Sequence, residues 1–502
     1  MYPIVGRPRC LYCYNRYMSI TTSAPAAVDP VTSTRPRLVL AICCMSLLIV
    51  GMDVTIVNVA LPSIRRDLGA SVSELQWTTA AYTVVLGSLL MLGGSMADRL
   101  GRARVFKFGL ALFTAASLAC SLAPGVGWLI AFRVLQGAAG AMLNPVAMSI
   151  IRNTFEDPRE RAQAIGIWGA VVGISMALGP ILGGLLVGLS WRAVFLVNIP
   201  IGLAAIALTA RFVPESRAPR PRRPDPVGQI LVILTLASLT SAIIEGPRLG
   251  WDSPWIHALA ITAGVSLVLL VRYELRRVDP LIEPRFFASR PFSAAAIIAV
   301  AAFAAFGGFL FLNTLYLQEV RDLSPLSAGL CTLPLAAMTV VVSPIAGRVV
   351  GTRGVRGPLV VGGLAVSVGS LMLVSLSAGT SLAWLLAAYS VFGLGFGAVN
   401  PPITNAAVSG MPASQAGVAA AVATTSRQIG LTLGVAVVGA VATAQVGGSL
   451  HDQLATASHT AWWLIAALGA GIAVLGLAAS TGAARASAER TAARLQEAPQ
   501  AA

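Results

Sequence analysis

Residues 37–62 read RLVLAICCMSLLIVGMDVTIVNVALP, an apolar run with a single acid, Asp53, well inside it. Such a run is long enough to cross the roughly 30 Å hydrocarbon core of a bilayer as one helix. Thirteen more apolar runs follow, at 77–97, 105–123, 127–150, 161–189, 193–212, 227–246, 254–271, 292–318, 327–347, 357–377, 382–403, 414–445 and 459–481. The sequence therefore predicts an all-α membrane protein with 14 transmembrane helices.

The composition agrees with a chain that lies mostly in the membrane. Of the 502 residues, 56% are hydrophobic and 11% are charged, against roughly 25% charged residues in a typical soluble domain. No stretch is polar for long enough to form a separate soluble domain. We therefore expect no fused receptor, kinase or nucleotide-binding module.

Motifs for catalysis and cofactor binding are missing from the sequence. Lys107 is the only lysine and it follows Phe106, so the Gly-Lys-Ser/Thr step of a P-loop is missing. HExxH and GxSxG are missing as well. Cys10 and Cys13 form one CxxC without a second ligand pair, so we expect no metal site there. The chain is predicted to have no catalytic residues and no cofactor, and to be driven by something other than ATP bound to it.

The basic residues predict the orientation of the chain. The net charge is +15, and 28 of the 35 basic residues fall in the tails and in the loops on the same side as the N-terminus. Because Lys and Arg are enriched in cytoplasmic loops, both termini are predicted to lie in the cytoplasm. Topology thus explains the positive charge, and we expect no nucleic-acid partner.

Two charged stretches divide the chain. RAPRPRRPDP at 217–226 is basic and Pro-rich, as a stiff extended connector is, and a charged loop at 272–290 precedes the last six helices. Met18 is an alternative first residue, because residues 1–17 have an unusual content of Cys, Tyr and Arg. The predicted parts are a disordered cytoplasmic N-terminal tail (1–36), an N-terminal six-helix bundle (37–213), a basic Pro-rich cytoplasmic linker (214–226), inserted helices 7 and 8 with their cytoplasmic loop (227–290), a C-terminal six-helix bundle (291–481) and a cytoplasmic C-terminal tail (482–502).

Two loops are similar in sequence. GSMADRLGRAR at 94–104 follows the second apolar run, and GRVVGTRGVR at 347–356 follows the tenth. Alignment of their first glycines places Gly101 on Gly354, whereas Asp98 falls on Gly351. Asp98 ends a predicted helix, where the helix dipole disfavours an acid, so it needs a partner, either a loop arginine or the N-terminus of another helix. Such a network suits a gate, although positive-inside topology alone would explain the arginines.

Two intramembrane charges are the first candidates for function, because ionisable groups inside a membrane are costly. Asp53 is the only acid deep in a span. It is a reversible proton carrier, a permanently ionised member of a buried ion pair, or an acid hydrogen-bonded near a helix end. Arg133 opens RVLQGAAGAMLN, in which Gly137, Gly140 and Asn144 share a helical stripe. Its guanidinium keeps its proton, so it either biases a nearby acid towards ionisation or clamps backbone carbonyls.

Other polar and small residues inside the spans are weaker candidates. GAVVGISMALGPILGG at 169–184 has glycines four apart and a Gly-Pro step, so it is either a moving joint or a rigid packing seam. Arg427 has either a substrate or coupling role or a packing role. The candidate residues of a substrate cavity, most of which a structural role would also explain, are Tyr82, Asn144, Asn313, Tyr316, Gln318, Asn400 and Arg427.

Together these motifs resemble the major facilitator superfamily, in its 14-helix branch of drug:proton antiporters. GSMADRLGRAR is similar to the signature loop of the superfamily, DVTIVNVALP at 53–62 to the first-helix motif of this branch, and RVLQGAAGA at 133–141 to its helix 4 motif. GPILGG at 179–184 is similar to the antiporter motif of helix 5. WRAVFLVNIPIG at 191–202, YLQ at 316–318 and LP at 333–334 fit the same branch. The resemblance covers residues 38–481.

The resemblance implies two six-helix bundles that alternate access to a central cavity, with an inserted helix pair between them. It implies export driven by protons, with Asp53 as the carrier and Arg133 as its electrostatic partner. Two departures concern the gate: Ser175 stands where the family has a glycine, and Gly351 where the second loop would have its acid. The implied gating residues are Gly94, Asp98, Arg99, Gly101 and Arg102 in the loop, and the implied antiporter motif residues are Gly179, Pro180, Gly183 and Gly184.

The predicted function is efflux of amphipathic small molecules or antibiotics by drug:proton antiport, since few polar groups in apolar walls suit such substrates. A dedicated exporter of an endogenous lipid, siderophore or secondary metabolite is the alternative. Proton-coupled uptake is disfavoured by the helix 5 motif, and a sensor without transport would show no proton flux. The high Ala, Gly and Arg content indicates a GC-rich bacterial genome, hence a bacterial cytoplasmic (inner) membrane with its lipids as neighbours, and a monomer is expected.

Overall fold

The computed structural model describes residues 35–218, 224–277, 280–409, 411, 415–444 and 450–497, which form helices and no strand. The predicted N-terminal tail up to residue 34, with Cys10, Cys13 and Met18, lies outside the described residues, as does the middle of the linker at 219–223. The described chain belongs to one compact unit.

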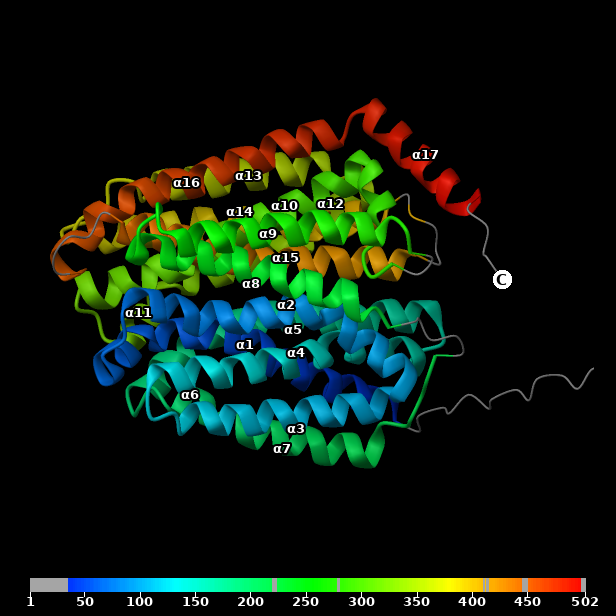
Figure 1. Cartoon of the computed structure of the whole chain (residues 1–502), viewed down its shortest axis with the longest axis horizontal. Helices are drawn as coiled ribbons and strands as arrows, with labels where there is room; N and C mark the ends of the chain where they lie inside the picture. Colours follow the sequence, from blue (N-terminus) through cyan, green and yellow to red (C-terminus); the bar gives the residue numbers. More distant parts are fainter. Residues whose placement is uncertain are drawn as a thin grey trace, which may run out of the picture. The chain divides into compact units, whose positions relative to one another are not determined.

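The first six predicted spans form the group of helices called here the N bundle. The sixth span is divided at Val197 into two helices that together run from Ala193 to Phe212. The helices of the N bundle, drawn from blue to green in Figure 1, are α1 (Pro36–Leu68), α2 (Val72–Leu100), α3 (Arg102–Ser121), α4 (Val126–Thr154), α5 (Pro158–Val187), α6 (Ala193–Leu196) and α7 (Asn198–Phe212).

The inserted pair consists of α8 (Pro226–Leu249) and α9 (Pro254–Glu274). α8 packs against α9, against α2 of the N bundle and against α15 of the following group, so it contacts both bundles (Figure 1). The C bundle contains η1 (Pro284–Ala288), α10 (Arg290–Leu315), η2 (Tyr316–Val320), α11 (Pro325–Cys331), α12 (Leu333–Arg353), α13 (Arg356–Leu371), α14 (Leu382–Val408), α15 (Ala416–Thr443) and α16 (Leu450–Ala479).

In the described residues, 13 helical segments are long and apolar enough to cross a membrane. They coincide with all the predicted runs except 357–377, where α13 is a shorter apolar helix of 16 residues. An all-α membrane protein is therefore confirmed, whereas the count of 14 spans stays a prediction. After them comes α17 (Gly482–Glu497), in the segment predicted only as a tail, and its Ser487 Oγ accepts a hydrogen bond from the Arg290 backbone N–H at 3.0 Å.

The two similar loops have the same backbone requirement. Gly101 joins α2 to α3 with a φ of 113°, and Gly354 joins α12 to α13 with a φ of 81°. Residues with a Cβ are strained at such φ values, which glycine adopts freely. The two glycines that the sequence repeat aligns therefore both allow a positive φ at the end of the preceding helix, in corresponding loops of the two bundles.

α1 and α5 cross at a seam of small residues. A Cβ added at Gly51 would stand 3.1 Å from the Cβ of Ser175 and would collide with its Oγ. Ser175 is fully buried, so it has no open space into which it could turn. Because one small partner is enough for close approach, the glycine on α1 allows a serine where a glycine is expected on α5.

We predict that Gly51→Ala disrupts this seam, because the new methyl group and the Ser175 hydroxyl require the same space. Overpacking of this kind costs about 1 to 3 kcal/mol, so the purified variant should melt at a lower temperature than the wild type. Adding Ser175→Gly should restore most of the loss. Gly169→Ala on α5 is the matched control, because a Cβ there meets nothing within 4 Å; equal destabilisation by the two alanines would contradict the seam.

Candidate functional site

The site centres on the carboxylate of Asp53, which is fully buried. Arg133 Nη1, from α4, forms an ion pair with Asp53 Oδ2. The other oxygen, Oδ1, accepts hydrogen bonds from Gln136 Nε2 at 2.9 Å and from Asn198 Nδ2, at the start of α7, at 3.3 Å. Both carboxylate oxygens thus have donors, as a charge buried in a membrane protein requires.

The guanidinium of Arg133 is held by several further groups. Its Nη1 donates to Gln136 Oε1 at 2.7 Å, and its Nε donates to the Thr78 carbonyl of α2 at 3.0 Å. The ring centre of Tyr82 lies 4.2 Å from the guanidinium carbon, in the geometry of a cation–π contact. Arg133 therefore combines the two predicted arrangements, because it pairs with the acid and also clamps a backbone carbonyl.

Three residues of this network were not singled out from the sequence. Gln136 lies three residues after Arg133 on the same face of α4, and Asn198 follows the break between α6 and α7. Ser117 Oγ of α3 accepts from Gln136 Nε2 at 2.9 Å and from Asn198 Nδ2 at 3.4 Å. Gln136 and Asn198 lie inside two of the quoted motifs, which was the available signal, whereas nothing around Ser117 distinguishes it.

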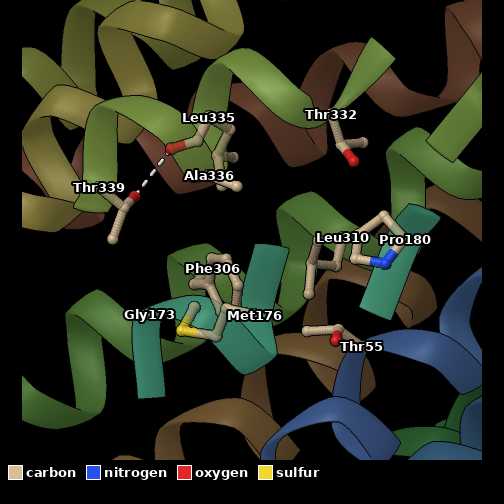
Figure 2. Close-up of a pocket in the computed structure, with 10 residues that line it drawn as sticks. All are labelled: Thr55, Gly173, Met176, Pro180, Phe306, Leu310, Thr332, Leu335, Ala336 and Thr339. Carbon is tan, nitrogen blue, oxygen red and sulfur yellow. Dashed lines mark hydrogen bonds between the residues drawn. The ribbon is translucent and has the colours of Figure 1, made fainter. Parts of the chain in front are cut away.

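The opposite face of α1 lines an apolar pocket between the two bundles. Successive residues of an α-helix are rotated by about 100°, so Asp53 and Thr55 point in nearly opposite directions. Asp53 faces the interior of the N bundle, and Thr55 faces the pocket. The residues drawn around the pocket in Figure 2, which come from α1, α5, α10, α12 and the turn before α12, are Thr55, Gly173, Met176, Pro180, Phe306, Leu310, Thr332, Leu335, Ala336 and Thr339.

None of the predicted cavity residues lines this pocket. Asn313 Oδ1 accepts a hydrogen bond from the Tyr389 hydroxyl at 2.6 Å, and the Tyr316 hydroxyl donates to the Ser377 carbonyl at 2.7 Å. Both contacts stay within the C bundle. In this conformation these two residues therefore hold helices of one bundle together.

The remaining cavity candidates are dispersed. Asn144 and Asn400 are half-buried on α4 and α14. Arg427 of α15 is also half-buried; its Nη2 donates to Thr404 Oγ1 at 2.5 Å, and its guanidinium carbon lies 5.7 Å from the ring centre of Phe303. A cavity role for these residues stays a prediction.

The signature loop is an ionic network. Asp98 Oδ1 accepts hydrogen bonds from Arg102 Nη2 at 3.0 Å and from Arg102 Nε at 3.2 Å, so a loop arginine is its partner. Glu215, just after α7, accepts from the backbone N–H groups of Ala103 at 3.0 Å and Arg104 at 3.1 Å. An acid is favourable there, because the N-terminus of α3 carries a partial positive charge.

The other loop residues are placed by packing. A Cβ added at Gly101 would stand 2.6 Å from the Glu215 carboxylate, so this glycine is needed for space as well as for its φ. A Cβ at Gly94 would make an ordinary contact, 3.6 Å from Pro145. Arg99 lies in the last turn of α2.

The glycines of the helix 5 motif pack against both bundles. A Cβ at Gly179 would collide with Thr55 Oγ1, and one at Gly183 would stand 3.2 Å from the Ile56 carbonyl oxygen of α1. A Cβ at Gly184 would stand 2.8 Å from the Pro325 carbonyl oxygen of α11. α5 is continuous through Pro180. In this conformation the motif is a packing seam, and its role as a moving joint stays a prediction.

Contacts between the bundles gather at the end that carries the α1–α2 loop, called here the outer end because the sequence predicts it outside the cell. Arg65 Nη1 pairs with Glu319 Oε2 at 3.2 Å. Gln318 Nε2 donates to the Val59 carbonyl at 2.9 Å, and Gln76 Nε2 donates to two carbonyls of α15, both at 3.0 Å. The bundles are thus closed against each other at the outer end.

Comparison with known sequences finds one family and relatives whose names describe drug resistance, export or efflux. Residues 43–435 match the family described as Major Facilitator Superfamily. The chain is 37% identical to the multidrug resistance protein Stp of Mycobacterium tuberculosis, over 82% of this chain and 76% of Stp. It is 36% identical to the tetracenomycin C resistance and export protein of Streptomyces glaucescens, over 84% of this chain and 79% of that protein. It is 37% identical to the multidrug efflux pump LfrA of Mycolicibacterium smegmatis, over 82% of each.

Solved structures show the same fold. A bacterial homologue of the human lysosomal transporter Spinster, inward-facing and unoccupied, has a TM-score of 0.64 at 18% identity and covers 92% of this chain and 98% of its own. A POT family transporter in complex with 5-aminolevulinic acid has a TM-score of 0.66 at 14% identity, with 89% and 95% covered. The chain therefore belongs to the major facilitator superfamily and is a membrane transporter of small molecules, not an enzyme.

Proposed function

We propose that this transporter exports amphipathic small molecules in exchange for protons, and that the Asp53–Arg133 ion pair couples the two movements. One observation carries the proposal: α1 bears the ion pair on one face and lines the pocket between the bundles on the other. Any shift of α1 that follows a change at Asp53 therefore changes the pocket. The efflux names of the relatives support the direction of transport.

The proposed coupling step is protonation of Asp53. A proton on this carboxyl removes its attraction to Arg133 and leaves a buried guanidinium without its counter-ion. Breaking a buried pair in this way costs about 3 to 5 kcal/mol. A difference of about 5.5 kcal/mol between two states is enough to reverse their populations from 1:99 to 99:1, so the pair has the strength to shift the equilibrium substantially.

The pocket supports amphipathic substrates. Its walls are mainly apolar, and the hydroxyl-bearing residues among those that line it are Thr55, Thr332 and Thr339. Its position at the interface means that both bundles contribute, as alternating access requires. A dedicated exporter of an endogenous product stays the alternative.

We further propose that the protein works in a bacterial cytoplasmic membrane as a monomer, with both termini in the cytoplasm and the proton as its only coupling ion. The charge distribution of the loops supports this orientation. We propose that this conformation, with its outer end closed, is the one that receives substrate from the cytoplasmic side.

We predict that Asp53→Asn abolishes proton exchange. In everted vesicles with an imposed proton gradient, amphipathic drugs should collapse the gradient through the wild type, and the variant should lose this response because its amide cannot release a proton. The matched control is Asp67→Asn, an acid on the same helix that pairs with Arg192 at 2.7 Å near its outer end.

The outcomes of this experiment test the role of Asp53 and separate the two candidate functions. An Asp53→Asn variant that behaves as the wild type, or an Asp67→Asn variant that fails equally, would exclude Asp53 as the coupling residue. If correctly folded wild type responds to no drug, the dedicated exporter is favoured instead.

A second prediction concerns the outer end. Arg65→Ala removes the ion pair that joins α1 to the C bundle, so the outer end should open more often. Partly exposed pairs contribute about 0.2 to 1 kcal/mol, which corresponds to an increase of up to about fivefold in labelling of Thr55→Cys by an impermeant maleimide added outside, in a chain without its native cysteines. Arg248→Ala is the control, because its pair with Glu245 lies within α8. Equal labelling of the parent chain and of its Arg65→Ala and Arg248→Ala variants would show that the Arg65–Glu319 pair does not hold the outer end closed.

A further inference from the structure

The α8–α9 hairpin contains a second buried acidic pair, separate from Asp53. Asp225 precedes α8 and Glu274 ends α9, and their exposed fractions are 5% and 2%. A Cβ added at Gly228 would stand 2.8 Å from Asp225 Oδ2 and closer still to Glu274 Oε1. Both oxygens thus lie within 2.8 Å of one point beside Gly228, so the distance between them is less than twice 2.8 Å.

One carboxylate oxygen of each acid accepts a hydrogen bond from the backbone. Asp225 Oδ1 accepts from the Gly228 N–H at 2.9 Å and caps α8, and Glu274 Oε2 accepts from the Leu281 N–H at 2.8 Å. The other two oxygens, Asp225 Oδ2 and Glu274 Oε1, have no hydrogen-bond partner among the described residues. Two buried carboxylates this close repel each other if both are ionised.

One cation balances one of the two acids. Arg277 Nε lies 3.4 Å from Asp225 Oδ2, and its Nη1 donates to the Tyr273 hydroxyl at 2.8 Å. Among the described residues, the charges that act on Glu274 are those of Asp225 and Arg277. Asp225 thus has two electropositive neighbours, the Arg277 guanidinium and the N-terminus of α8.

Charged groups of the other helices that pack on α8 have their own partners. On α2, Glu74 bonds Ser71 and Asp98 bonds Arg102, and Arg99 lies in the last turn. On α15, Arg427 bonds Thr404. At the start of α8 the contact with α2 is neutral, because the Ser88 carbonyl accepts from Gln229 Nε2 at 2.7 Å. At the other end of the hairpin, Trp77 Nε1 of α2 donates to Glu245 Oε1 at 3.0 Å, and Glu245 also pairs with Arg248.

We propose that Asp225 and Glu274 share one proton, held by Glu274 and donated to Asp225 Oδ2 directly or through one water. A single proton satisfies Asp225 Oδ2 and Glu274 Oε1 at once and removes the repulsion. The result is a second proton site, at the end of the inserted hairpin that the sequence predicts in the cytoplasm. The site does not depend on which substrate is transported.

The shared proton ties three segments together: the start of α8, the end of α9 and the loop at Leu281. The folded hairpin binds a proton that the unfolded chain releases more readily, so this stabilisation is present at lower pH and is lost as pH rises. The shared proton makes the inserted hairpin sensitive to the pH of the compartment that it faces. Because α8 packs on both bundles, such a change in the hairpin reaches both of them.

Hydrogen exchange at the backbone N–H groups of Leu281 and Gly228 tests this proposal. After correction for the intrinsic effect of pH on exchange, protection in the full-length wild type should fall as pH rises. Glu274→Gln should keep protection constant, because its amide donates to Asp225 Oδ2 as the protonated acid does. Glu274→Ala should lose protection at every pH, and Glu245→Gln, at the other end of the hairpin, should behave as the wild type.

Several results would overturn the proposal. A pH-independent wild type would show that no proton is shared. A Glu274→Gln chain that loses protection or fails to fold would show that both groups must be ionised, and loss of wild-type protection on adding a chelator would replace the proton by a metal ion. As a second readout, the infrared absorption of protonated carboxyls should be equal in the wild type and in Glu245→Gln and weaker in Glu274→Gln, which lacks the contribution of Glu274.

Discussion

The ion pair between Asp53 and Arg133 constrains the N bundle more than any other contact. A charge inside the membrane is tolerated only if it is paired and its remaining hydrogen-bonding groups are satisfied. That requirement explains why five helices, α1, α2, α3, α4 and α7, contribute to the network around the pair, with Gln136, Asn198 and Ser117 completing the hydrogen bonds. It also explains the glycines of α4: a Cβ at Gly137 would collide with the Tyr82 carbonyl oxygen, so glycine lets α2 bring its carbonyls and the Tyr82 ring up to Arg133.

α1 transmits this constraint to the interface between the bundles. Its Asp53 face is fixed by the ion pair, and its opposite face packs against α5 and lines the pocket through Thr55. The seam with α5 is tight at Gly51 and at Gly179, so α1 and α5 must move together. In the proposed mechanism, a change of charge at Asp53 acts on the pocket through packing, without direct contact between the proton and the substrate. Such an arrangement would suit exchange, because proton and substrate would then act on the same helix.

The sequence predicts the helices and the Asp53–Arg133 pair, but it does not predict the contacts between residues that are far apart in the chain. Apolar runs and loop charges predicted the helices, because a bilayer imposes length and composition directly. The motifs predicted that Asp53 and Arg133 would meet. Their polar neighbours, the replacement of the expected glycine at position 175 by one at position 51, and the pairing of Asp225 with Glu274 all join residues far apart in the chain, which periodicity does not record. The predicted cavity residues were chosen for polarity alone, and Asn313 and Tyr316 instead bond within the C bundle.

The pH dependence of the distance between the bundles at the outer end tests most directly whether the Asp53–Arg133 ion pair controls the conformational equilibrium. Spin labels report this distance by pulsed electron paramagnetic resonance in lipid nanodiscs. They are attached at Gly125→Cys in the α3–α4 loop and at Gly379→Cys in the α13–α14 loop of a chain without its native cysteines. If the ion pair controls the conformational equilibrium, the distance distribution should change with pH in this chain and should be the same at all pH values after Asp53→Asn. An unchanged pH response in the Asp53→Asn chain would contradict the account.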